Sequence, residues 1–275
     1  MKLRRPYAAF TLIELIMVIA IIGVVAALTL PMLGSFRKGD AMLAATRQML
    51  DATARARQLA ISHHTTVYMV FVPPTLWSDT ALANGNLTAV QMVSSTNVLD
   101  KQLTGYAFVS LRSVGDQPGR PTPRYLSSWQ SLPDSSFIPV WKFTLLNNQA
   151  MQFRPEPSGP IYTVYGFDLA NVPTGPTIPF PSVEPYYNSP RVTAYPVLPY
   201  IAFDYLGRLV SGRDEYIPLA HGSVLTARDP ISRRLLARAP SALESPSGNS
   251  TNISFNLVHI DWLTGRARLE RAEPR

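Results

Sequence analysis

Apolar residues dominate the first part of the chain, directly after a short basic start. From Leu15 to Leu33, nineteen residues carry no charge, and as a helix they would span roughly 28 Å, close to the hydrocarbon thickness of a bilayer. Lys2, Arg4 and Arg5 precede this stretch without an acid. The positive-inside bias therefore predicts a single membrane span over residues 15–33, with a cytoplasmic N-terminus and an extracytoplasmic remainder.

A different apolar pattern follows Pro31. Apolar side chains recur at spacings of three and four, which is typical of an amphipathic helix. This stripe consists of Met42, Ala45, Met49, Ala52, Ala56 and Leu59. We expect one long helix over residues 10–62, bent near Pro31 because proline lacks an amide donor and crowds the preceding turn. We interpret the stripe as core packing.

Beyond residue 62 the pattern changes to short runs of β-branched and aromatic residues, which favour strands. Such runs cover residues 65–72, 106–112, 141–145, 150–153, 200–204, 222–227, 253–260 and 266–270, with a turn at 263–265 before the last. Eleven prolines between residues 154 and 200 are too many for central strands and predict an extended surface loop or insertion. Shorter loops are expected over 115–135 and 240–252.

Composition fits a globular domain attached to an anchor. The chain has 275 residues, of which 46% are hydrophobic and 16% charged, enough for one core of ordinary size. It has no cysteine, so packing alone must stabilise the fold. The predicted fold class is α+β, with the long N-terminal helix followed by a β-rich domain over residues 63–275.

One carboxylate, Glu14, stands at the start of the apolar run. A cleaved secretory signal would use Val25-Ala26-Ala27 as its cut site, and a plain anchor would place Glu14 near the lipid headgroups. A charge costs about 2.5 to 3.5 kcal/mol at the membrane centre and less near its edge, and a disposable signal gains nothing from it. Composition alone leaves both alternatives open.

The order of residues is more specific. Phe10-Thr11-Leu12-Ile13-Glu14-Leu15, followed by an aliphatic run with Gly23 and Pro31, resembles the N-terminus of the type IV pilin and pseudopilin superfamily. The resemblance implies a prepilin leader peptide over residues 1–9, cleavage by a prepilin peptidase between Ala9 and Phe10, and N-methylation of Phe10. The chain departs from the family at Ala9, where the family strongly prefers glycine.

The resemblance also implies a role for Glu14. Cleavage creates a positive amine on Phe10, and in a helical filament the Glu14 of one subunit can face the Phe10 amine of its neighbour. A buried carboxylate without a partner costs several kcal/mol. Glu14 is therefore predicted to act in subunit assembly.

Three later segments resemble a narrower group, that of minor pseudopilin H (GspH) and FimT-like minor pilins. They are ARARQLAISHHTTVYMVF, YIAFDYLGRLVSG and LVHIDWLTGRARLER. With the N-terminus they cover about 40% of the chain. This resemblance implies a long N-terminal helix and a globular domain of two packed antiparallel sheets, whose strands alternate inward apolar and outward polar residues.

Catalytic and metal-binding patterns are weak. His63 and His64 are adjacent and point in different directions on any regular element, while His221 and His259 lack an acid or cysteine at ligand spacing. No nucleotide-binding, serine-hydrolase or zinc-protease motif occurs, and Asp214-Glu215 is interpreted as a solvated pair. We expect no enzyme, no cofactor and no metal site, with a membrane-anchored periplasmic enzyme or binding module as an alternative.

Charge adds one further hypothesis. The formal net charge is +7, and removal of the three basic leader residues leaves +4. On a strand, Arg266 and Arg268 point to one face, where two guanidinium groups can hold phosphates. Gly265-Arg266-Ala267-Arg268 resembles the G-R-x-R tail through which FimT-type minor pilins bind DNA. The alternative is a solvated basic edge strand that guards against aggregation.

The sequence thus predicts a structural minor pilin or pseudopilin of a type II secretion pseudopilus or a type IV pilus. Its expected partners are other pilin or pseudopilin subunits, the prepilin peptidase and the inner membrane. A secretion substrate, or DNA in the DNA-binding alternative, would be a further partner. The expected location is the inner membrane, with one span and a periplasmic globular domain, and later a filament.

Overall fold

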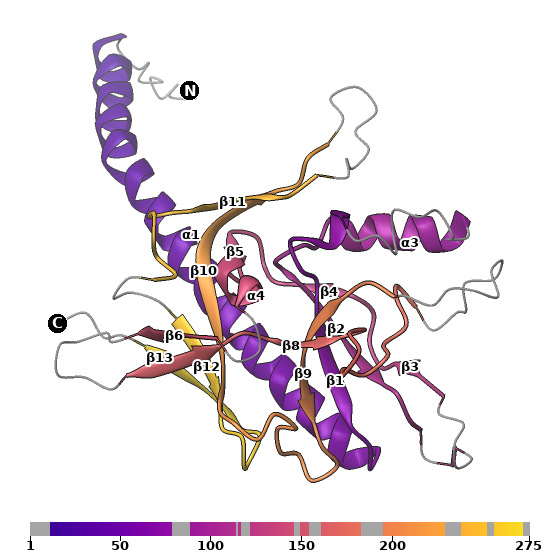
Figure 1. Cartoon of the computed structure of the whole chain (residues 1–275). Helices are drawn as coiled ribbons and strands as arrows, with labels where there is room; N and C mark the ends of the chain where they lie inside the picture. The colour runs from indigo at the N-terminus through magenta and orange to yellow at the C-terminus, as the bar shows by residue number, and fades with distance from the viewer. Residues whose placement is uncertain are drawn as a thin grey trace, which may run out of the picture. The chain divides into compact units, whose positions relative to one another are not determined.

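The structure is a computed structural model that describes residues 12–78, 89–113, 115–116, 122–145, 149–153, 161–182, 195–228, 238–251 and 256–271. The chain divides into two compact units, residues 1–40 and 41–275. Helix α1 (Leu12–Ser62) runs through Pro31 without interruption and contributes to both units (Figure 1). The predicted leader over residues 1–9 and the predicted helix start at Phe10 lie outside the described residues.

The second half of α1 carries the predicted apolar stripe. Ala45, Met49 and Ala56 are fully buried, and Ala52 is 5% exposed. Met42 and Leu59, at the two ends of the stripe, are partly buried against the same cluster. The interpretation of the stripe as core packing is therefore confirmed.

The larger sheet has six antiparallel strands. Its main order is β3 (Arg124–Tyr125), β2 (Gly105–Ser110), β1 (Val67–Phe71), β9 (Leu198–Phe203) and β8 (Asp168–Ala170), and β4 (Gln130–Ser131) also pairs with β2. The register places Met69 of β1 opposite Phe108 on one side and Ile201 on the other. These three apolar side chains belong to one buried cluster.

The second sheet has five strands. It runs β11 (Ser241–Glu244), β10 (Glu215–Leu225), β12 (Asn256–Ile260) and β13 (Ala267–Arg271), with β5 (Ser136–Phe137) also paired with β10. A separate hairpin joins β6 (Ala150–Phe153) and β7 (Tyr162–Tyr165). All strand pairings in the described part of the chain are antiparallel.

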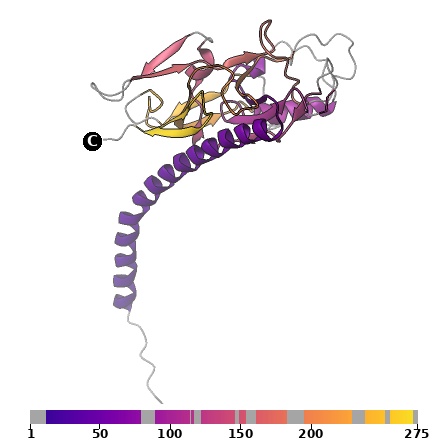
Figure 2. The ribbon, with the colours of Figure 1, turned by 90° about the horizontal axis from the view of Figure 1, so that it is seen from below.

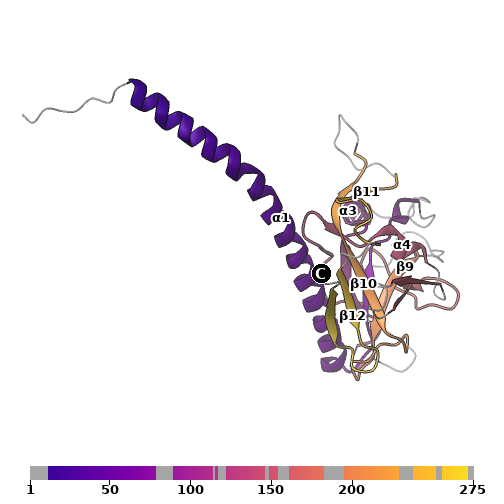
Figure 3. The same cartoon turned by 90° about the vertical axis from the view of Figure 1, so that its left-hand side faces the viewer.

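Both sheets share one core with α1. The cluster around the helix stripe includes Met69 and Phe203 from the larger sheet and Ile217 and Val258 from the second sheet. The second half of α1 lies along the sheets in Figure 2, and β10 and β12 lie beside it in Figure 3. The predicted pair of antiparallel sheets is present, but the two sheets meet through a core that also contains the helix.

The opposite face of the larger sheet has its own cover. Val70, Val109 and Leu198 pack there against Val98 of helix α3 (Ala89–Leu99) and Phe180. The short helix η1 (Leu76–Ser78) adds the buried Leu76. Helix α3 has no counterpart among the sequence predictions.

The proline-rich stretch 154–200 differs from the predicted surface loop. Within its described part it contains β7, β8 and the start of β9, and it buries Ile178 and Phe180. Pro199 fits in β9, an inner strand, because β9 pairs with β1 only from Tyr200 onward. The missing amide therefore falls where β1 requires no donor.

One predicted strand is wrong. Residues 141–145 fall mainly in helix α4 (Val140–Thr144), which begins after Pro139, whose φ is −63°. A short apolar run cannot by itself distinguish a strand from a buried helical turn. The other seven predicted strands correspond to β1, β2, β6, β9, β10, β12 and β13, although β10 begins seven residues earlier than predicted.

Candidate functional site

The N-terminal part of α1 is apolar on every side. Within residues 12–25 every large apolar side chain is exposed, from 47% at Val18 to 78% at Leu12. Glu14 lies in the first turn and is the only charged residue of this segment. A helix that is hydrophobic all round is normally buried in a larger assembly or in a membrane. This surface therefore requires a partner that covers it.

The two predicted processing residues, Ala9 and Phe10, lie outside the described residues. Glu14 lies inside them and is exposed. In the part of the chain that the structure describes, no helix is both long enough and apolar enough to cross a membrane. The side chains of residues 26–33, the second half of the predicted span, are not among those described.

The predicted arginine pair lies at the β12–β13 hairpin. The turn between the strands is fixed by the Asp261 carboxylate, which accepts hydrogen bonds from the Thr264 hydroxyl and amide, both at 2.7 Å. These bonds lower the pKa of Asp261 below its ordinary value. Arg266 follows the turn with an exposed side chain, and Arg268 lies on β13 with its side chain 70% exposed.

The arginine pair does not form a purely basic surface. Arg268 donates a hydrogen bond from Nε to Oε1 of Glu270 at 2.7 Å, which raises the pKa of Arg268. Burial raises the pKa of Glu270, but the bonds from Arg268 and His259 outweigh it, so the net shift is downward. Arg266 has no ion-pair partner among the described residues. The pair therefore consists of one guanidinium group bound to a carboxylate and one without an ion-pair partner among the described residues.

A histidine that the sequence analysis set aside lies next to this pair. The Nδ1 atom of His259 is 3.3 Å from Glu270, and its Nε2 atom is 3.1 Å from Asp214. Its ring stacks on Tyr216, with ring centroids 4.5 Å apart. Both ring nitrogens of His259 therefore face carboxylate oxygens. Sequence spacing gave no signal because the strand register brings these residues together.

The acids at 214 and 215 do not form the predicted solvated pair. Asp214 is partly exposed, but Glu215 is buried, with Oε2 3.4 Å from Nζ of the fully buried Lys142. Arg213 links Glu215 and Asp168, each at 3.2 Å. Burial lowers the pKa of Lys142 and raises that of Glu215. This buried charge network joins α4, β10 and β8.

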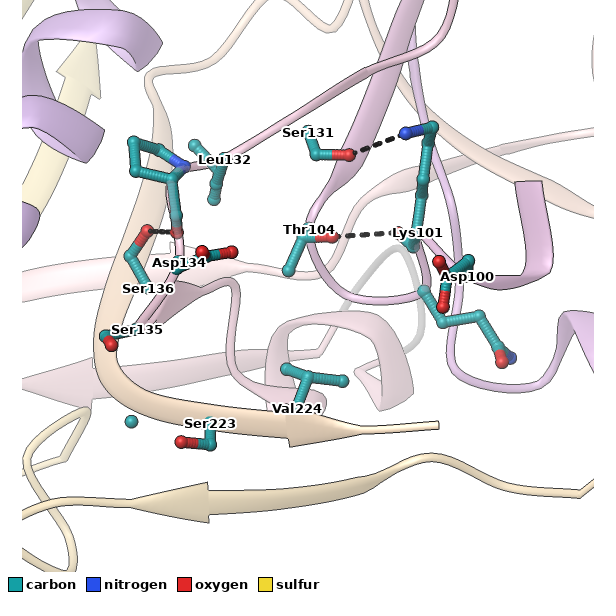
Figure 4. A pocket seen from close by; sticks show the side chains of 13 residues that line it. Asp100, Lys101, Thr104, Ser131, Leu132, Asp134, Ser135, Ser136, Ser223 and Val224 are labelled. Atoms are coloured by element: carbon teal, nitrogen blue, oxygen red, sulfur yellow. Dashed lines mark hydrogen bonds between the residues drawn. The ribbon is translucent and has the colours of Figure 1, made fainter. Parts of the chain in front are cut away.

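The described part of the domain formed by residues 41–275 is hollowed in several places, and two of these hollows bear on the site. One, of about 410 Å³, lies between the turn at 100–104, the loop over 131–136 and β10 (Figure 4). The other, of about 360 Å³, lies along α1 and is lined by Arg47, Asp51 and Arg55 over Tyr106 and Phe108. Neither hollow is lined by Lys142, Glu215 or His259. The described residues contain no group of three or more His, Cys, Asp or Glu able to hold a metal ion.

A family comparison bears on the N-terminal segment. Residues 4–30 match the family model of the prokaryotic N-terminal methylation motif. This motif is typical of type IV pilins and pseudopilins, and it supports a pilin-like subunit that assembles with others in a filament. No curated protein and no solved structure matches the chain.

Proposed function

We propose that the chain is a structural minor pilin or pseudopilin, processed by prepilin peptidase between Ala9 and Phe10. The observation that carries this proposal is the coincidence of two features at one place. Residues 4–30 match the methylation motif, and residues 12–25 form a helix whose large apolar side chains are all exposed. An assembly of such helices would cover a surface that the single chain leaves open.

The proposed assembly step depends on charge. After cleavage, the Phe10 amine of one subunit pairs with Glu14 of its neighbour among apolar side chains. Removal of one partner from a buried ion pair costs about 3 to 5 kcal/mol. The pair would therefore select the register in which every Glu14 meets an amine.

The proposed location follows from the basic start of the chain. Lys2, Arg4 and Arg5 keep the leader in the cytoplasm. The apolar helix then holds the chain in the inner membrane until assembly, with residues 63–275 in the periplasm. The proposed machine is a type II secretion pseudopilus or a type IV pilus, and the two share this topology.

Within the superfamily, we place the chain with minor pseudopilin H and FimT-like minor pilins. Support comes from the direct passage from α1 into β1 and from the closing β12–β13 hairpin. The role we propose is non-catalytic, and consists of initiation, adaptor or cargo contact. The buried charged groups Lys142 and Glu215 pair with each other inside the protein, which supports a structural use.

Intact-mass analysis with N-terminal sequencing of the chain from its native membrane tests the proposal. The expected mature chain begins at N-methylated Phe10. An Ala9→Gly variant provides the control, because it restores the residue that the resembled family prefers and should be cleaved at least as fast. A chain that starts at Met1, or after residue 27, would overturn the proposal.

A further inference from the structure

The hollow between the turn at 100–104, the loop over 131–136 and β10 lies where β5 begins beside β10, and we call it the strand-edge cavity. It has a volume of about 410 Å³. Three segments line it: the turn after α3, the loop from β4 to β5, and β10 at Gly222–Val224 (Figure 4). None of the lining residues is aromatic. The cavity therefore offers polar groups and backbone edges, and no stacking surface.

The backbone of β10 is open on this side. The His221 carbonyl accepts a hydrogen bond from the Ser245 amide at 2.9 Å, on the β11 side, whereas the Gly222 amide donates to the Ser135 carbonyl at 3.0 Å, on the opposite side. Directions alternate along an antiparallel strand, so Val224 also turns its amide and carbonyl away from β11. On that side β5 pairs only with Ala220 and His221. The edge at Val224 therefore meets no described strand.

The loop from β4 to β5 leaves this gap because it turns back on itself. Ser136 donates from its amide and hydroxyl to the Pro133 carbonyl, and Ser135 has a φ of 68°. The loop therefore joins β10 only at Ser135, which contacts Gly222, and β5 then pairs with His221 and Ala220. The cavity is the space that a longer β5 would fill.

Several polar groups around the cavity have unused bonding capacity. The Asp134 carboxylate and the hydroxyls of Ser135 and Ser223 have no hydrogen-bond partner among the described residues. Lys101 uses one of its three donors, on Ser131 Oγ at 3.0 Å. Asp100, by contrast, pairs with Arg228 at 2.7 Å. The carboxylate left without a counter-charge is that of Asp134, which is exposed.

We propose that the strand-edge cavity receives an extended polypeptide segment of a neighbouring filament subunit, which carries a lysine or arginine. The segment adds to β10 by pairing its backbone with Val224, and its cation pairs with Asp134. Strand addition uses main-chain hydrogen bonds for affinity and side-chain contacts for specificity. The β10–β11 pair also exposes the side chains of Leu225 and Leu243, to 56% and 57%. These side chains would add apolar contact area for the bound segment.

A polypeptide fits these features better than other polar ligands. An amide donor and a carbonyl acceptor of one residue, facing the same way, match the spacing of another peptide chain. A saccharide or a nucleobase would gain from an aromatic platform, which the cavity lining lacks. The identity of the neighbour as a filament subunit rests on the proposed function.

Site-specific photo-crosslinking tests this inference. A benzophenone amino acid replaces Ser223 in the full-length chain, in cells that assemble the filament. Mass spectrometry then identifies the crosslinked peptide. We expect a product with a segment of a second pilin-like subunit that contains lysine or arginine. Val224→Pro should reduce its yield about tenfold, because it removes a donor that the β10–β11 ladder does not use.

A second variant and a control position complete the design. Asp134→Lys reverses an exposed charge without altering the ladder and should reduce the yield several-fold. A benzophenone at Leu263, on a distant turn, should give a different product. Crosslinks only within the chain, a glycan-bearing product, or yields unchanged by both variants would overturn the inference. The proposed function is tested separately by N-terminal sequencing of the subunit recovered from sheared filaments.

Discussion

Arg57 of α1 donates a hydrogen bond from Nε to the carbonyl oxygen of Thr264, 2.7 Å away in the β12–β13 turn. The next residue, Gly265, packs so closely on the turn after β9 that a Cβ built on it would lie 1.9 Å from the Gly207 carbonyl oxygen. The end of α1 and two turns from distant parts of the sequence thus meet at one point. This junction closes one end of the core.

Gly265→Ala should destabilise the domain strongly. Gly265 has a φ of 61° and no room for a side-chain carbon, so we expect a loss of about 3 kcal/mol or more in the free energy of unfolding. Gly212→Ala is the matched control, because Gly212 has a φ of 67° but open space around it. It should cost about 1 kcal/mol. Denaturant unfolding measures both, and equal losses would contradict the close approach.

Lys142 and Glu215 of the buried charge network should be energetically coupled. Glu215→Gln leaves the fully buried Lys142 without its carboxylate and should cost about 3 to 5 kcal/mol. Lys142→Met should cost less, because Arg213 still pairs with Glu215 at 3.2 Å. In a double-mutant cycle, the double variant should regain part of the loss of Glu215→Gln. Strictly additive losses would show that the two residues are not coupled.

The hairpin turn should respond to acid. The hydrogen bonds from Thr264 lower the pKa of Asp261 below its ordinary value of 3.8, so its contribution to stability is present above pH 3.8 and is lost as the pH falls below that value. Asp261→Asn keeps an oxygen acceptor but cannot titrate. Between pH 5 and pH 3 the melting temperature of this variant should fall less than that of the parent. An equal fall in melting temperature for both proteins would rule out a stabilising role for the ionised Asp261 carboxylate.

Glu14→Ala should impair assembly and leave processing intact. Without the carboxylate, the amine of the neighbouring Phe10 has no partner among apolar side chains, so incorporation into filaments should fall at least tenfold. Glu14→Asp keeps the charge and should recover part of the incorporation. Immunoblots of sheared filaments and membranes measure both quantities. Normal incorporation of Glu14→Ala would mean that the charge pair is not used.

The arginine pair at the hairpin is expected to contribute little to DNA binding. Because Arg268 is bound to Glu270, only Arg266 offers an unpaired charge among the described residues of the pair. Duplex titrations at low and high salt should therefore give the same slope for the parent chain and for Arg266→Ala with Arg268→Ala. A marked loss of salt-sensitive binding in the double variant would establish the DNA-binding alternative instead.

Local pattern predicted much of the fold. The stripe through Met49 and Ala56 predicted the buried face of α1, because one-sided burial leaves a periodic trace in sequence. The β-branched and aromatic runs predicted β1 and β12, because such residues favour strands. The strand prediction for residues 141–145 was wrong because a short run of mixed apolar and polar residues after a proline fits a strand and a helical turn equally well. The predicted start of β10 was seven residues too late because Pro218 interrupts the apolar run of this strand. The structure accommodates the proline, since only β12 pairs with β10 at that residue.

The site could be predicted only where chemistry is local. The motif from Phe10 to Glu14 is contiguous, so its pattern is visible in the sequence. The contacts of His259 with Asp214 and Glu270 depend on strand register across β10, β12 and β13, which no spacing rule reports. The unpaired edge at Val224 likewise depends on where β5 begins, which is set by the turn at Ser135.

The junction at Arg57 also constrains the order of folding. Arg57 and Thr264 are separated by 207 positions, and contacts of such long range form slowly because loop closure precedes any gain from them. The helix leaves the ribosome before the strands, but the last part of its cover forms only when β12 and β13 arrive. A chain cut short before this hairpin would keep part of the α1 stripe open. A fragment of the domain would thus differ from the finished subunit by the apolar surface that it exposes.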